Sequence, residues 1–235
     1  MSIDVYWSMC PFRWEGAYRV EDPENISKKF LSEQPGSHFY SRCPSTQEHL
    51  KNLYGLRQIY DANFDFDIDN NSIYADDEET FNMLFIRSLE NNLFSWSTGY
   101  IFFTEKDSLI MEVLPAYLED NKIVNKTIMV PGRIDIGKWF RPLDFAFHLK
   151  KENRKCVLNF NLDDIITYVH FKTDEKINLK YYHMNSELSL LMKQLMNTKM
   201  KKVPDPRKGL EWFYNIISKR KLKPKILKHI KQNIA

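Results

Sequence analysis

Strict alternation of apolar and acidic side chains marks residues 63–69, Asn63-Phe64-Asp65-Phe66-Asp67-Ile68-Asp69. Side chains of a β-strand point alternately to its two faces, so this period of two predicts a half-buried strand with its aspartates in solvent. Asn70-Asn71 suits the following turn, because asparagine tolerates left-handed backbone angles. Residues 72–74 are the predicted return strand of a hairpin at the edge of a sheet.

Strand-like runs continue along the chain without helical periods between them. They are short apolar and aromatic stretches at residues 83–87, 99–104, 109–114, 126–130, 143–150, 155–160 and 165–171. The 16 Phe and 12 Tyr also favour strands. Strands at this frequency are typical of an antiparallel β-sandwich or barrel. We therefore predict a mainly β (α+β) fold with a β-rich core domain over residues 40–182.

Helices are expected on both sides of the strand-rich region. Ser45-Thr46-Gln47-Glu48 has capping-box spacing and predicts a short helix to about residue 53. Residues 183–235 are predicted to form a basic helical subdomain with N-caps at Asn185 and Asp205 and a last amphipathic segment over 222–234. Residues 1–39, interrupted by prolines, are predicted to be an irregular N-terminal cap in which only residues 3–7 resemble a strand.

The composition excludes several classes of function. The 7 glycines form neither GxGxxG nor GxxxxGK[ST], which argues against dinucleotide and P-loop chemistry. The 3 cysteines are far apart and are interpreted as ordinary thiols in a reducing compartment. A signal peptide and a transmembrane segment are not apparent in the sequence, so we expect a cytoplasmic location, or a virion if the gene is viral.

The charge is unevenly distributed along the chain. Residues 199–235 carry an excess of ten positive charges, which leaves −7 for the first 198 residues of a chain with net charge +3. Such a basic arm could bind a protein partner, nucleic acid or another anionic surface, or mediate homo-oligomer formation. The candidate binding residues are Lys219, Arg220, Lys221, Lys223, Lys225 and Lys228; a solvated helix face is the alternative.

Two histidines lie in similar strand contexts, Phe147-His148-Leu149 and Val169-His170-Phe171. On neighbouring antiparallel strands, His148 and His170 could supply two ligands of a divalent metal such as iron, with Asp144 as the third. The alternative is no cofactor, with both histidines paired to carboxylates or backbone. Asp65, Asp67 and Asp69 have the 1, 3, 5 spacing of a calcium loop, but the glycine and the terminal glutamate of such loops are missing.

Two resemblances to known families can be stated. Pro131-Gly132-Arg133-Ile134-Asp135 resembles the Gly-x-Ile-Asp segment of the deoxyuridine triphosphatase and deoxycytidine deaminase barrels, without the Tyr-x-Gly continuation of that family. The stretch of residues 40–175 resembles an uncharacterised family of proteins of tailed phages of marine bacteria. The resemblance lies in the order and type of Ser41-Arg42-Cys43-Pro44, the alternating strand and the later Ile134-Asp135-Ile136. That resemblance implies no established activity.

No catalytic constellation is evident beyond these candidates. We therefore expect a non-enzymatic phage-type protein that binds a partner or joins an assembly. The alternative is a β-barrel enzyme, either a cupin-like metal-dependent oxygenase or a nucleotide-processing barrel. The first could be tested by metal content and the second by deoxynucleotide turnover.

Overall fold

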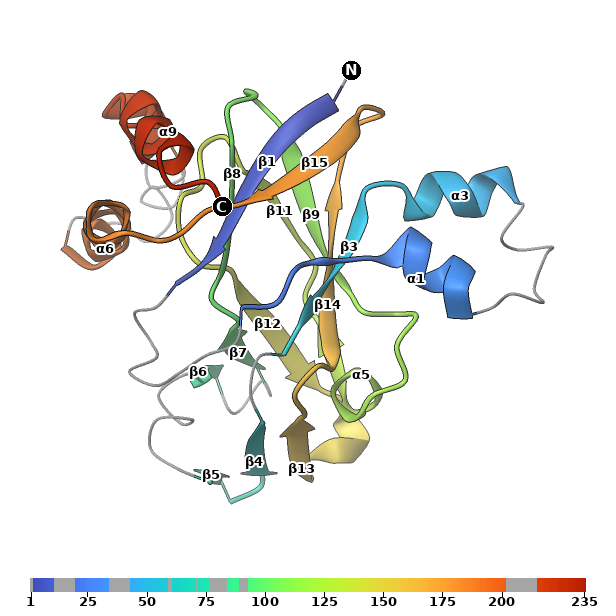
Figure 1. The fold of residues 1–235 in the computed structure, drawn as a ribbon. Coiled ribbons are helices and arrows are strands. Elements are labelled where there is room, and N and C mark those ends of the chain that lie inside the picture. The colour runs from blue at the N-terminus through green and yellow to red at the C-terminus, as the bar shows by residue number, and fades with distance from the viewer. Residues whose placement is uncertain are drawn as a thin grey trace.

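The first strand of the chain, β1 (Ser2–Met9), lies between two strands from later parts of the sequence (Figure 1). It pairs in parallel with β15 (Lys176–Tyr181) and antiparallel with β8 (Tyr100–Thr104). The computed structural model describes residues 2–10, 20–33, 43–58, 61–70, 72–76, 84–88, 93–201 and 215–235. The strand predicted at residues 3–7 is confirmed, and it occupies the middle of a sheet.

Three further sheets have the strand orders β11-β9-β14-β3-β2, β10-β12-β7-β6 and β13-β4-β5, and their pairings are antiparallel. Their strands are β2 (Glu24–Asn25), β3 (Leu53–Arg57), β4 (Ala62–Asp67), β5 (Ser72–Ala75), β6 (Leu84–Ser88), β7 (Leu93–Ser97), β9 (Ile110–Pro115), β10 (Thr127–Met129), β11 (Gly132–Asp135), β12 (Asp144–Leu149), β13 (Lys155–Phe160) and β14 (Ile165–Phe171). The strands predicted from residue 63 to residue 171 are confirmed, whereas β2, β3, β7, β11 and β15 were not predicted.

One hydrophobic core joins the four sheets. Each contributes buried side chains to it, for example Trp7 from β1, Phe66 from β4, Phe147 from β12 and Phe171 from β14. The described strands pack as layers and do not close into a barrel. The mainly β prediction is thus confirmed in its sandwich form.

The alternating stretch that led to this prediction forms β4 and the turn after it. Phe64, Phe66 and Ile68 are buried in the common core, as expected from the period of two. The predicted return strand is β5, which is the edge of its sheet, while β4 lies between β5 and β13.

Helices cover the outer faces of two sheets (Figure 1). On the five-stranded sheet, α1 (Ile26–Glu33) and α3 (Pro44–Leu50) contribute Ile26 and Leu50 to a small cluster with Ile165 and Tyr168. The other helices are α5 (Lys122–Lys126), η2 (Lys151–Asn153), α6 (Ser186–Lys201), α8 (Ile216–Lys219) and α9 (Lys223–Lys231).

The C-terminal helices form a layer on the β15-β1-β8 sheet. Tyr6 of β1 and Phe103 of β8 point away from the sandwich core and pack with Leu188 of α6 and Ile230 of α9. Strand β8 is buried along its whole length because both of its faces are covered. After α9, the backbone N–H of Ala235 donates to the carbonyl of Tyr181, so the last residues contact the end of β15.

Of the three predicted helix caps, one is confirmed and one is wrong, and one segment predicted to be irregular is helical. The side chain of Asn185 accepts a hydrogen bond from the N–H of Leu188 at 2.9 Å, so the predicted cap of α6 is confirmed. The capping-box prediction is wrong, because α3 begins at Pro44 with Cys43 as N-cap and Ser45 lies inside the helix. Residues 26–33 form α1 instead of an irregular segment. The predicted cap at Asp205 lies outside the described residues.

Candidate functional site

His170 lies on β14, on the outer face of the five-stranded sheet, and is almost fully buried. A shift of register between Ile165 and Thr167 interrupts β14. The sequence alternation placed His170 with Tyr168 and Ile166; Tyr168 is on the outer face, but Ile166 belongs to the inner core because of this bulge.

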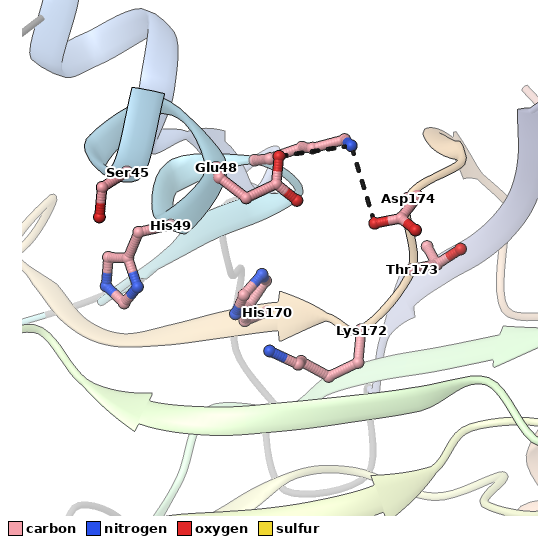
Figure 2. A pocket seen from close by; sticks show the side chains of 8 residues that line it. Ser45, Glu48, His49, His170, Lys172, Thr173 and Asp174 are labelled. Atoms are coloured by element: carbon pink, nitrogen blue, oxygen red, sulfur yellow. Dashed lines mark ion pairs between the residues drawn. The ribbon is translucent and has the colours of Figure 1, made fainter. Parts of the chain in front are cut away.

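His49, in the last turn of α3, faces His170 across a cavity of about 590 Å³ (Figure 2). The two imidazole centroids are 6.4 Å apart, and the rings are nearly perpendicular. The residues that line this two-histidine cavity are Ser45, Glu48, His49, Lys51, His170, Lys172, Thr173 and Asp174. They come from α3 and from the end of β14 with its following turn, so segments more than a hundred residues apart form one site.

Asn52 holds the two walls of the cavity together. Its side-chain amide donates to the carbonyls of Thr173 and Glu175, both at 2.9 Å, and its oxygen accepts from the N–H of Ile177 at 3.2 Å. Its backbone has φ of 55°, a left-handed conformation that asparagine tolerates better than most residues. The junction between α3 and β3 is thereby fixed to the turn between β14 and β15.

Hydrogen bonds orient both imidazoles. His49 Nε2 lies 2.6 Å from the hydroxyl of Tyr117, and an N–H of His170 donates to the backbone carbonyl of Lys51. Burial lowers the pKa of His170 below its ordinary value, and the ammonium of Lys172 lowers it further. His170 is therefore neutral near pH 7, and its second ring nitrogen is a hydrogen-bond acceptor.

Charges are arranged differently on the two sides of the cavity. At the rim, Lys51 lies 3.7 Å from Glu48 and 3.9 Å from Asp174 (Figure 2), but the Asp174 side chain is 98% exposed and is screened by solvent. Near His170, Glu112 pairs with two cations. Arg133 lies 2.7 Å from its carboxylate and Lys172 lies 3.8 Å from it, so two cations neutralise the Glu112 charge.

The predicted metal ligands His148, His170 and Asp144 are not brought together. His148 and Asp144 lie on β12, which belongs to a different sheet from β14. Four residues along a strand separate Asp144 from His148 by roughly 13 Å, which is too far for one metal ion. Among the residues that the structure describes, no group of three or more His, Cys, Asp or Glu could hold a metal ion.

The described end of the basic tail, residues 215–235, packs on the folded protein. Lys223 pairs with Asp107 at 2.6 Å, and Lys231 pairs with Glu105 at 2.7 Å. Of the other predicted binding residues, Arg220, Lys221, Lys225 and Lys228 are exposed, and Lys219 lies in α8 with its side chain outside the description. Residues 215–235 thus present exposed lysines on a helical layer instead of forming a free arm.

The remaining polar motifs have local partners. Asp67 accepts hydrogen bonds from Asn70, and Asp69 pairs with Arg154 at 2.7 Å. These contacts agree with a solvated face of the hairpin. Asp135, in the barrel-like segment, accepts from the N–H of Gly137 and pairs with Lys138.

Sequence reasoning missed His49, Lys172 and Tyr117 as site residues. His49 was within the predicted helix, and Lys172 follows His170 by two residues. The available signal was the direct passage from this helix into β3, where Leu53 pairs with His170. To use this signal, one must know that β3 pairs with β14, and the sequence pattern does not specify which strand β3 pairs with.

No described helix is long and apolar enough to cross a membrane. The three cysteines are free, as predicted. No family model, curated protein or solved structure matches this chain.

Proposed function

We propose that this chain is a binding protein that holds an anionic oxygen group, a carboxylate or a phosphate, in the two-histidine cavity. The observation that carries the proposal is the convergence of His49 and His170 on one cavity, with the ammonium of Lys172 beside them. Imidazolium and ammonium groups are charge-assisted donors to oxyanions. The ammonium of Lys172 lies close enough to His170 to lower its pKa, so it can also interact with an anion bound there.

Anion binding in this cavity is expected to take up a proton. The pKa of free His170 is held below its ordinary value by burial, so the imidazole is neutral before binding. A bound anion stabilises the imidazolium and raises that pKa, and by linkage the affinity increases as the pH falls. Glu48, Glu112, Asp174, Lys51 and Lys172 are the other charged groups around the cavity.

Isothermal titration with inorganic phosphate and with acetate tests the proposal. Titrations at pH 6 and pH 8, in buffers of different ionisation enthalpy, give the affinity and the number of protons taken up. We expect binding to be tighter at pH 6. His170→Gln and His49→Gln should weaken it about tenfold or more, the loss expected for one charge-assisted hydrogen bond.

His148→Gln is the matched control, because His148 is a partly exposed strand histidine in another sheet. It should bind as the unmodified chain does. The proposal fails if neither anion binds at millimolar concentration, or if all three variants bind equally.

A second candidate function rests on the exposed lysines of α9. Lys225 and Lys228 are exposed, while Lys223 and Lys231 are paired with acids of the sheet edge. This arrangement favours contact with an acidic partner or a second copy, as expected for a phage-type protein that joins an assembly in the cytoplasm. For the enzyme alternatives, the described strands form no closed barrel, so binding is the better-supported function.

Light scattering after size exclusion, at low and high salt, tests this second candidate. Removing the tail would expose Tyr6 and Phe103, so truncation would confound assembly with unfolding. Charge reversal of Lys225 and Lys228 to Glu leaves the core intact. A mass that drops to the monomer in this variant supports assembly, and an unchanged monomer in both chains rejects it.

A further inference from the structure

A second cavity, of about 160 Å³, lies on the other side of Tyr117 and is apolar. It lies between the end of β9, α5, β10, β12 and β14, and its lining residues are Pro115, Ala116, Tyr117, Ile123, Val124, Thr127, Ile128, Met129, Phe147 and Ile166. The hydroxyl of Thr127 donates a hydrogen bond to the carbonyl of Ile123 at 2.6 Å. An apolar cavity of about 150 Å³ stays dry and binds benzene, so this one has room for a similar group.

The apolar cavity is accessible from the surface. Ile128 is 58% exposed and Tyr117 is 43% exposed, although both line the cavity. Leu118 and Val130, their neighbours in the sequence, are also large exposed apolar side chains. Such a concentration of exposed apolar surface around an opening is typical of a binding site.

Tyr117 connects the two cavities. Its ring lines the apolar cavity, and its hydroxyl lies 2.6 Å from Nε2 of His49, which lines the two-histidine cavity. The ring packs edge-to-face on Tyr168 at 5.2 Å, and the hydroxyl of Tyr168 donates to Glu119. Lys29 of α1 pairs with Glu119 at 2.7 Å. The side chain of Tyr117, packed against Tyr168, therefore separates a site for anions from a site for apolar groups.

We infer that the two cavities take the two ends of one ligand, an amphipathic carboxylate whose apolar chain places about five carbons in the apolar cavity, if each takes roughly the 30 Å³ of one water molecule. The carboxylate lies between His49 and His170, and the chain crosses the exposed ring of Tyr117 into the apolar cavity. The inference rests on the proposed anion site. Most of the affinity for such a ligand then comes from burial of its apolar chain.

Titration with acetate, butyrate, hexanoate and octanoate at one pH tests the inference. Each buried methylene should raise the affinity about fourfold until the apolar cavity is filled, after which the increase should level off. Octanol, which has the chain without the carboxylate, should bind more weakly than octanoate.

Variants separate the two ends of the ligand. Val124→Trp fills the apolar cavity and should abolish the dependence on chain length while acetate still binds. Val157→Trp is the control, since Val157 is an exposed apolar residue of β13 outside the cavity. His170→Gln should weaken every acid by the same factor and leave the increase per methylene unchanged.

Binding of acetate and phosphate without any gain from chain length would overturn the inference and leave the proposed function standing. Absence of binding by every anion would overturn both. A gain from chain length that survives Val124→Trp would place the apolar end elsewhere and refute the assignment of this cavity. Retained binding of acetate by Val124→Trp shows that this variant is folded.

Discussion

Replacement of Asn52 by alanine tests whether one side chain holds the walls of the two-histidine cavity together. The change removes three hydrogen bonds, which join Asn52 to Thr173, Glu175 and Ile177. Each contributes about 0.5–1.5 kcal/mol to stability. Alanine must also adopt the left-handed backbone angle of 55°, at a cost of about 1–2 kcal/mol. We expect the free energy of unfolding to fall by about 3–5 kcal/mol.

Urea unfolding followed by tryptophan fluorescence measures this loss. The midpoint should fall while the dependence on urea concentration stays constant, and the melting temperature should drop by roughly 6–20 °C. Asn178→Ala is the control, because it removes an amide hydrogen bond to Asp4 at an exposed position and should change stability by less than about 0.5 kcal/mol. A loss below about 1 kcal/mol for Asn52→Ala would refute the assigned role.

Ile230→Ala removes three carbons from a fully buried side chain of α9 and should cost about 2–5 kcal/mol in one cooperative transition; a separate transition for the tail would contradict its place in the core. Asn185→Ala should cost about 1 kcal/mol through loss of the α6 cap, and Asn185→Ser should retain most of it, as thermal unfolding would show. Because the pKa of His170 is lowered in the folded state, the unfolded state binds more protons just below pH 6.5, so the free energy of unfolding should decrease as the pH is lowered through this range. His170→Gln should reduce this dependence on pH, and an unchanged dependence would argue against the buried neutral imidazole.

The sandwich could be predicted because its information is local. The alternation of Phe64, Phe66 and Ile68 specifies both a strand and its buried face, and the turn residues specify where the strand ends. Strand β15 also alternates, with Ile177, Leu179 and Tyr181 on the core side, but this pattern was overlooked. Its parallel pairing with β1, from the far end of the sequence, is what the local pattern does not specify. The apolar run of β8 was predicted as a strand, but its two covered faces depend on helices that pack there from the C-terminal end.

The candidate site could be predicted only in part. His170 was identified because it lies on a clear strand, but its partner was expected on another strand, at His148. The true neighbour, His49, lies on a short helix that the sequence did not connect with β14. A bulge near Thr167 also changed which residues share a face with His170. Pairing between distant strands and irregularities within them are tertiary features, and a single sequence does not specify either.

The place of β1 between β8 and β15 has a consequence for biosynthesis. When β1 leaves the ribosome, 166 residues lie between Met9 and Lys176, the first residue of its parallel partner. At about 5–20 residues per second, β1 waits roughly 10–30 s for that partner and longer for α9, which covers its outer face. Both edges of β1 are unpaired until β8 is synthesised, and the edge that later pairs with β15 stays open to chaperones or to a neighbouring nascent chain for the rest of this interval. Expression at low temperature or with a holdase chaperone should therefore improve the soluble yield more than stabilising the finished fold.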